Sequence, residues 1–311
     1  MEITEIPEIP EIPEFVKNAA SVGRLVIFIG AGVSRLLGYP SWKELADKYS
    51  YYLHLKGKLN YLELENLKKL DARKLLSICY QLDDNKNIQE LLKPSSNEEN
   101  KEFADIYKDI YSLNQRVIFI TTNFDKELDN AYEEEKKRGT LNHPASEIVS
   151  DPIKISGKVA DYANGTIIHL HGSLGSKMIL TIEDYFTHYQ EEKIQEFLRD
   201  LFTNYTVLFI GYGLEEYEIL EFLIHKSHLP KLNNRRKEER EIKHCLLYPM
   251  FSWQKSLLKF YRLYYENFNI ELVPYNIDKK GYYQLYEVIK NWTLELSPAL
   301  NIIELIDKFV K

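Results

Sequence analysis

Short apolar runs separated by segments with helical spacing dominate this chain. Val26–Ile29 and Val117–Thr122 are continuous β-prone runs, as expected for strands buried on both faces of a sheet. The same pattern predicts four more strands, at residues 166–172, 206–211, 244–248 and 270–273. Strands that alternate with helices indicate an α/β fold with a Rossmann-like, doubly wound parallel sheet of about six strands.

The first long connection is an exception to this alternation. Residues 41–113 have helical spacing and many charges throughout, and they are too many for one crossover. We therefore expect a helical insertion between the first two strands, beginning at a helix capped by Ser41. The insertion lies within a domain of residues 24–311.

Residues 1–23 differ in composition from the rest of the chain. They contain three Glu-Ile-Pro repeats followed by a short helix candidate at Phe15–Val22. Proline at every third position disfavours both helix and sheet ladder, so we expect an extended arm. It is either a disordered leader or an arm that docks on a neighbouring subunit.

Composition and charge exclude several classes of protein. The 311 residues carry a net charge of −7, which argues against a broad surface that binds nucleic acid. The basic run Arg235-Arg236-Lys237 stands among acids and fits a solvated loop. Two cysteines, Cys79 and Cys245, permit neither a disulfide framework nor a four-cysteine zinc site, and they fit a reducing cytoplasm. No apolar run reaches the roughly 18 residues of a membrane span.

Unusual residues follow four of the predicted strands. Ligands of a doubly wound sheet bind beyond the carboxyl ends of its strands, so these residues are candidates for one site. In chain order they are Gly30, Ala31, Gly32 and Ser34; Thr122, Asn123 and Asp125; His171 and Gly172; and Gly211, Tyr212 and Gly213.

The Gly30-Ala31-Gly32 loop is either a tight strand-to-helix turn or a loop whose amides bind a pyrophosphate. A dehydrogenase fingerprint requires a third glycine at position 35, where this chain has Arg35. It also requires an acid about 20 residues further on, at the tip of a second strand. Residues 41–49 have helical spacing instead. The loop therefore indicates a nucleotide, but not an ordinary dehydrogenase.

Asn123 and Asp125 each have a structural alternative. Asparagine is a favourable N-cap, here for a helix running to Tyr132, and an aspartate in the first turn suits the helix dipole. Gly211-Tyr212-Gly213 is either a plain turn or a second loop that approaches a ligand. Glu215 and Glu216 after it either contact a ribose or cap the following helix.

His169 and His171 stand two residues apart, so we expect both to point to the same face of the sheet. His169 lies deeper in the strand and is interpreted as a buried structural histidine. His171 stands at the strand tip, where it is either structural or a general base.

The order of these motifs resembles the sirtuin (silent information regulator two) superfamily. The matching text is Gly30–Ser34, Gly38-Tyr39-Pro40, Thr121–Asp125, His171-Gly172 and Gly211-Tyr212-Gly213, within about residues 24 to 276. The text from His169 to Leu214 is most similar to the sirtuin-like NAD-cleaving domains of bacterial anti-phage defence systems.

This resemblance implies an NAD glycohydrolase that releases nicotinamide and ADP-ribose and depletes NAD in abortive infection. Asn123 and His171 are the implied catalytic residues, and Asp125 the residue that contacts nicotinamide or stabilises positive charge. NAD is then a substrate, and no metal is required. The cysteines for a sirtuin zinc site are absent, and Pro40-Ser41-Trp42-Lys43 departs from the Pro-x-Phe-Arg turn of the deacetylases.

Two other classes of function remain open. One is an NAD-dependent protein deacylase or ADP-ribosyltransferase, and the other is a non-catalytic module that senses NAD or ADP-ribose. Because free NAD cleavage would harm the host, we expect control by homo-oligomerisation, by a partner defence protein or by a phage-derived activator. We expect no direct contact with a membrane or with nucleic acid.

Overall fold

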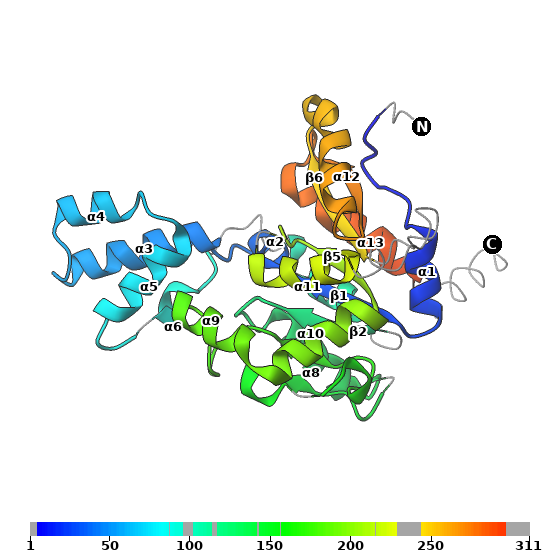
Figure 1. Cartoon of the computed structure of the whole chain (residues 1–311), viewed down its shortest axis with the longest axis horizontal. Coiled ribbons are helices and arrows are strands. Elements are labelled where there is room, and N and C mark those ends of the chain that lie inside the picture. Colours follow the sequence, from blue (N-terminus) through cyan, green and yellow to red (C-terminus); the bar gives the residue numbers. More distant parts are fainter. Residues whose placement is uncertain are drawn as a thin grey trace.

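The centre of the structure is a single parallel sheet. The computed structural model describes residues 5–86, 88–95, 102–113, 117–141, 143–155, 157–214, 216–228 and 244–296. Seven strands follow the order β3-β4-β2-β1-β5-β6-β7. Figure 1 labels β2, β1, β5 and β6 of this sheet. They are β1 (Leu25–Ile29), β2 (Val117–Thr121), β3 (Ile148–Val149), β4 (Ile167–His169), β5 (Thr206–Ile210), β6 (His244–Met250) and β7 (Ile270–Asn276). The predicted Rossmann-like α/β fold is confirmed.

The sheet has one strand more than the pattern predicts. The additional strand is β3, at the edge of the sheet beside β4. Its two residues are too few to produce a readable alternation or apolar run.

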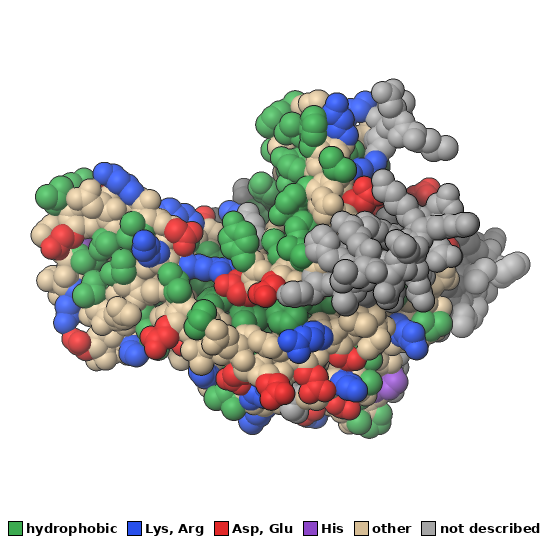
Figure 2. All heavy atoms as spheres, viewed as in Figure 1, with side chains coloured by type: hydrophobic (Ala, Val, Ile, Leu, Met, Phe, Trp, Pro, Cys, Tyr) green, Lys and Arg blue, Asp and Glu red, His purple; other side chains and the backbone are tan. Residues whose placement is uncertain are grey.

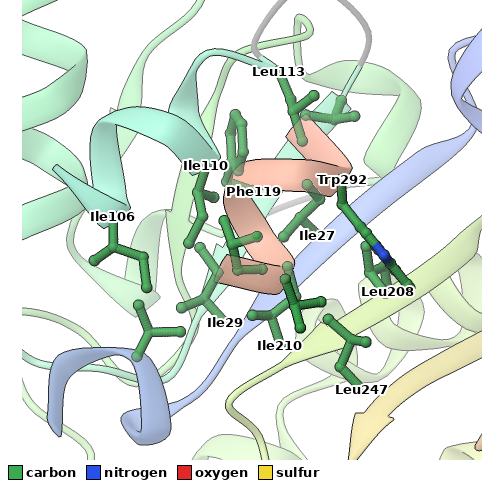
Figure 3. Close-up of a cluster of buried hydrophobic side chains, with 14 of the residues drawn as sticks. Ile27, Ile29, Ile106, Ile110, Leu113, Phe119, Leu208, Ile210, Leu247 and Trp292 are labelled. Carbon is green, nitrogen blue, oxygen red and sulfur yellow. The ribbon is translucent and has the colours of Figure 1, made fainter. Parts of the chain in front are cut away.

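Helices cover both faces of the sheet because successive strand residues point to opposite sides. Ile27 and Ile29 of β1 join the core on one face, which Figure 3 shows together with Trp292, and Phe28 joins the core on the other. The first core is covered by α1 (Glu14–Ser21), α2 (Ala31–Leu36), α7 (Ile106–Tyr111), α8 (Glu127–Arg138) and α13 (Gln284–Leu296). The second is covered by α9 (Ile182–Gln190), α10 (Glu192–Asn204), α11 (Tyr217–His228) and α12 (Leu258–Glu266).

Four short 3₁₀ helices complete the described elements. They are η2 (Pro152–Lys154), η3 (Val159–Asp161), η6 (Ser252–Leu257) and η7 (Gly281–Tyr283). The 3₁₀ helix η6 continues directly into α12. Among the described helices, none has the length and apolar character to cross a membrane.

The helical insertion forms a lobe at one end of the molecule (Figure 1). It consists of α3 (Trp42–Leu55), α4 (Tyr61–Leu67), α5 (Ala72–Leu82) and α6 (Ile88–Leu91). These helices enclose a third core of their own, which also takes in Phe124 and Leu180 from the sheet domain. The last helix of the predicted insertion, α7, packs instead on the sheet core. The lobe therefore comprises α3 to α6, and α7 returns the chain to the sheet.

The Pro-rich arm lies along its own chain. Ile6 and Ile12 are buried, the Asn276 amide donates to the Pro7 carbonyl, and the Trp292 indole donates to the Pro10 carbonyl at 2.8 Å. These contacts join the arm to β7 and α13. For residues 5–13, the expectation of a disordered leader was therefore wrong, and docking on a neighbouring subunit stays a prediction.

Two sequence predictions concern residues outside the described ranges. The basic run Arg235–Lys237 and Glu215 both lie outside them. The structure therefore gives no account of the expected solvated loop or of a role for Glu215.

Candidate functional site

Four adjacent strands carry the predicted site residues at one edge of the sheet. Their order is β4-β2-β1-β5, and all four run in the same direction. The loops that follow them contain the glycine loop, Asn123, His171 and Gly211. The fold thus brings the four motifs to one edge, as expected from the sheet type.

The two glycine loops pack directly against each other. The Gly32 amide donates to the Gly211 carbonyl at 2.8 Å, and the Gly30 amide donates to the Ile210 carbonyl at 3.0 Å. A Cβ atom at Gly30 would lie 2.6 Å from the Gly211 carbonyl oxygen. A Cβ atom at Gly211, where φ is +60°, would lie 2.7 Å from the Val33 amide nitrogen. Close approach of the two loops thus requires glycine at these positions.

A buried hydrogen-bond network surrounds Asn123. Its Nδ2 donates to the Gly30 carbonyl at 3.0 Å, to Ser34 Oγ at 2.8 Å and to Tyr107 Oη at 3.1 Å. Ser34 Oγ donates to Asp125 Oδ2 at 2.6 Å and lies 2.8 Å from Tyr107 Oη. We call Ser34, Tyr107, Asn123 and Asp125 the Asn123 cluster.

The donors and acceptors of this cluster can be assigned. The Gly30 carbonyl can only accept, so the Nδ2 side of the Asn123 amide must face it. The Ser34 hydroxyl gives its hydrogen to Asp125, which leaves Tyr107 to donate to Ser34. The Oδ1 atom of Asn123 has no hydrogen bond to the described residues, so an acceptor is left for a ligand.

Asn123 is not a helix cap. The helix α8 begins at Glu127, and the amide of Glu127 donates to Asp125 Oδ1 at 3.1 Å. The expectation that Asn123 caps this helix was wrong, because the chain extends past β2 for several residues before it turns. Burial raises the pKa of Asp125, although the Ser34 hydroxyl and the Glu127 amide lower it.

A pocket lies beside the Asn123 cluster. It is open to solvent, and its empty volume of about 420 Å³ includes part of that solvent. Its lining includes four predicted site residues in addition to Ser34, namely Ala31, Thr122, Asn123 and Asp125, together with Tyr39, Pro40, Trp42, Leu45, Leu92 and Phe124. Three of these lining residues, Trp42, Leu45 and Leu92, come from the helical insertion, so the lobe forms one wall.

His171 lies outside this pocket lining, in a turn after β4. Gly172, at φ +79°, allows that turn, because a Cβ atom there would lie 1.7 Å from the Lys177 carbonyl oxygen. His171 Nε2 lies 2.8 Å from Tyr189 Oη and 3.6 Å from Glu216 Oε2, and Nδ1 lies 3.3 Å from Tyr185 Oη. We call His171, Tyr185, Tyr189 and Glu216 the His171 cluster.

The two histidines face opposite sides of the sheet. His169 Nε2 lies 2.7 Å from Asp129 Oδ1 of α8, whereas His171 contacts tyrosines of α9. The expectation that both point to one face was wrong, because β4 ends at His169 and the turn before Gly172 redirects His171. His169 is fully buried and paired on both ring nitrogens, as a structural histidine is expected to be.

Burial shifts the pKa values within the His171 cluster in opposite directions. It lowers the pKa of His171 well below its ordinary value, with His188 and Arg73 adding to the effect. It raises the pKa of Glu216 to about 7, against the lowering effects of Arg73, Tyr212 and Tyr189. His171 is therefore neutral near pH 7, as a general base must be.

Two aromatic rings separate the clusters. The Trp42 ring lies 5.6 Å from the Phe124 ring in the pocket wall and 6.4 Å from the Tyr185 ring, centre to centre. The Tyr185 ring in turn lies 4.8 Å from the His171 ring. Asn123 and His171 are therefore at the same edge of the sheet, but the structure does not join them in one cavity.

Sequence reasoning missed several residues of both clusters. Tyr107 stands in a helix that otherwise packs on the core, and Tyr185 and Tyr189 follow ordinary helical spacing. Glu216 was considered for a ribose contact or a cap, but its carboxylate is turned inward. The chain has 23 tyrosines, and nothing in the sequence distinguishes Tyr107, Tyr185 and Tyr189 from tyrosines of the core. Within the described ranges, no three His, Cys, Asp or Glu side chains gather as metal ligands.

Comparison with known proteins gives two matches. Residues 117–265 match the SIR2-like domain family, a range that contains Asn123, Asp125, His171 and Gly211. Over 208 residues the chain is 30% identical to "Defense-associated sirtuin 2" of Bacillus subtilis. The match covers 63% of this chain and 18% of that relative, so the chain spans under a fifth of the relative's length. The resemblance to sirtuin-like proteins is therefore confirmed.

Proposed function

We propose that this chain cleaves NAD to nicotinamide and ADP-ribose, and the match of residues 117–265 to the SIR2-like domain family supports the proposal. The observation that carries the proposal is the Asn123 carboxamide. Protein acceptors hold its Nδ2 side, and its Oδ1 side is left in a pocket that Ala31 and Thr122 also line. A fixed acceptor at the carboxyl edge of a parallel sheet suits a ribose hydroxyl or an attacking water.

In the proposed reaction, water attacks the ribose carbon that carries nicotinamide. The bond from that carbon to the nicotinamide nitrogen breaks, and its electron pair leaves with nicotinamide. Such a reaction passes through an oxocarbenium-like transition state, as in glycoside hydrolysis. Asn123 orients the water or the hydroxyl, and His171, neutral because burial lowers its pKa, accepts the proton.

The remaining predicted residues bind the substrate in this scheme. The amides of Gly30 and Gly32 already donate to Ile210 and Gly211, and the Ser34 hydroxyl already donates to Asp125. The Ala31 amide is therefore the strongest candidate for the pyrophosphate, and Ser34 would have to release Asp125 to contact it. Gly30, Gly32, Gly211, Tyr212 and Gly213 shape the loop pair on which the dinucleotide lies. Thr122 lines the same pocket, and Asp125 stabilises positive charge or contacts the carboxamide of nicotinamide.

Bound NAD must pass the Trp42 ring to reach His171 from the pocket. Since the Trp42 and Tyr185 rings stand between the pocket and His171, we expect them to shift when NAD binds. Trp42 begins α3 of the lobe, so binding would be coupled to the helical insertion. Closure of the lobe over bound NAD would also exclude bulk water from the site.

We further propose a role in anti-phage defence by depletion of NAD. The similarity to "Defense-associated sirtuin 2" supports this role. Assembly, a partner protein or a phage-derived activator would control the activity. Hydrophobic side chains gather at the tip of the lobe around α4 (Figure 2), where Leu55, Tyr61 and Leu62 are each about two-thirds exposed. This tip is our candidate for contacts that control assembly.

The test is a product assay on the purified chain. Incubation with NAD should yield nicotinamide and ADP-ribose in equal amounts, and Asn123→Ala and His171→Ala should each stop their release while keeping a folded far-UV spectrum. Transfer to an acyl-lysine peptide or to a protein would support the deacylase or transferase alternative. Binding of NAD without turnover would support a sensing module, and undiminished release by both variants would refute the catalytic assignment.

A further inference from the structure

Glu216 is a buried carboxylate that the proposed reaction does not use. Only 7% of its surface is exposed, although it lies just before α11. Its Oε2 accepts a hydrogen bond from Tyr189 Oη at 3.5 Å and lies 3.6 Å from His171 Nε2. A carboxylate buried beside a candidate general base requires an explanation, because burying a charge is costly.

Several charged or titratable groups face Glu216 or its neighbours. Arg73 comes from α5 of the lobe, where it lies over the Tyr185 ring and pairs with Glu218 at 3.2 Å. Among the described residues, the groups that act on the cluster include Arg73 of α5, His171 after β4, Asp184, Tyr185, His188 and Tyr189 of α9, Tyr212 after β5, and Glu218 of α11. Arg73 is the cation that offsets the charge of Glu216, so the lobe contributes directly to this cluster.

The hydroxyl of Tyr189 connects Glu216 to His171. An ionised carboxylate can only accept, so the single hydroxyl hydrogen of Tyr189 goes to Glu216. Tyr189 Oη, 2.8 Å from His171 Nε2, must then accept, and Nε2 must carry the imidazole hydrogen. A neutral imidazole with its hydrogen on Nε2 has a lone pair on Nδ1, which here accepts from the Tyr185 hydroxyl 3.3 Å away.

We propose that Glu216 is a positioning residue that acts through Tyr189, holds the imidazole hydrogen of His171 on Nε2, and so leaves Nδ1 as the base. The use of Nδ1 as a base rests on the proposed NAD cleavage. The geometry agrees, because Nδ1 faces Tyr185, and Tyr185 leads through Trp42 to the pocket. Nε2 faces the interior, where the charge of Glu216 would stabilise the imidazolium formed when Nδ1 accepts a proton.

Protonation of Glu216 would reverse the arrangement. A neutral carboxyl group donates its hydrogen to Tyr189 Oη, which frees the Tyr189 hydroxyl to donate to His171 Nε2. The imidazole hydrogen then moves to Nδ1, and Nδ1 can no longer accept a proton. No proton leaves the cluster except the one that Glu216 gains or loses.

Glu216 is the group of this cluster that titrates near neutral pH. Burial raises its pKa to about 7, whereas burial lowers the pKa of His188 to about 4 and that of His171 well below its ordinary value. Burial also holds the pKa values of Tyr185 and Tyr189 well above their ordinary range. The inference therefore predicts that kcat rises with pH through about 7.

The kinetic test compares wild type with Glu216→Gln, Tyr189→Phe and the exposed control Glu183→Gln. Wild type and the control should gain kcat between pH 6 and pH 8 in a single one-proton step. The Glu216→Gln variant should lose that step, and Tyr189→Phe should lower kcat about 10- to 100-fold with little change in KM. An unchanged pH step in Glu216→Gln would overturn the proposal.

A second test needs no turnover. The ¹⁵N chemical shifts of His171, assigned by their loss in His171→Gln, report which ring nitrogen carries the hydrogen. Wild type should show the hydrogen on Nε2 at pH 8 and on Nδ1 at pH 6, and Glu216→Gln should lose this pH dependence. If wild type cleaves no NAD, the proposed function fails while these shifts still test the role of Glu216. If wild type and Glu216→Gln show the same His171 tautomers at both pH values, the proposed role of Glu216 is refuted.

Discussion

The Asn123 and His171 clusters lie at the same edge of one sheet, but their buried polar groups are hydrogen-bonded in different ways. In the Asn123 cluster, the Ser34 and Tyr107 hydroxyls are paired, as are both hydrogens of the Asn123 amide and the Asp125 carboxylate. In the His171 cluster, a carboxylate shares its environment with a histidine through one tyrosine hydroxyl. The first arrangement has one assignment of hydrogens, and the second has two.

This difference teaches how the two clusters respond to pH. The asparagine, serine and tyrosine of the first cluster do not change charge near neutral pH, and Asp125 has two donors that lower its pKa against the effect of burial. The second cluster contains Glu216, whose pKa of about 7 allows a change of charge under physiological conditions. We therefore expect the Asn123 cluster to fix geometry and the His171 cluster to respond to protonation.

The largest effect on stability is expected at Glu216. Its pKa is 4.5 unfolded and about 7 folded, so its ionisation disfavours folding. The contribution is most favourable below pH 4.5 and is lost as the pH rises through 7, a change of about 3 kcal/mol. Glu216→Gln should therefore gain stability relative to wild type between pH 5 and pH 8, as measured by urea unfolding. A constant difference across this range would show that Glu216 does not titrate as described.

The corresponding test in the Asn123 cluster is Ser34→Ala. This change removes the 2.6 Å donor to the buried Asp125 carboxylate and an acceptor of the Asn123 amide, so unfolding should cost about 1–3 kcal/mol less. The loss should be larger at pH 8 than at pH 5, because the ionised form of Asp125 depends on the donor. Urea unfolding checks this, and Ser21→Ala, at an exposed position outside both clusters, is the control. A neutral effect at both pH values would contradict the network.

Tyr107→Phe should have the smallest effect. The variant loses one hydroxyl that bonds Ser34 and Asn123, at a cost of about 1 kcal/mol. The pH dependence of kcat should keep its wild-type shape, unlike that of Tyr189→Phe in the other cluster. If Tyr107→Phe flattens the pH profile and Tyr189→Phe does not, the roles of the two clusters are reversed.

Much of the fold could be predicted because its signals are local. The apolar run before Gly30 ends at Ile29, where β1 also ends. The run before Asn123 ends at Thr122, one residue after the end of β2. Ser41 and Thr181 form the capping boxes at the starts of α3 and α9. Parallel pairing then follows from the alternation of strands and helices, and it brings the four motifs to one edge.

The contents of the two clusters could not be predicted because they depend on the tertiary path. The side chain of Tyr107 reaches Asn123 only because α7 returns to the sheet core after the lobe. His171 faces α9 because of a turn that Gly172 permits, and no periodicity signals this turn. Burial of Glu216 depends on how the loop after β5 meets α9 and Arg73, contacts that the sequence does not encode locally.

The account rests on both clusters serving one reaction, and a double-variant cycle tests this most directly. Nicotinamide release would be measured for wild type, Asn123→Ala, His171→Ala and the double variant, each checked for folding. Each single change should lower the rate about 10²- to 10⁴-fold. The rate of the double variant should be only slightly lower than that of the slower single variant. Losses that multiply, or full turnover in either single variant, would contradict a shared reaction.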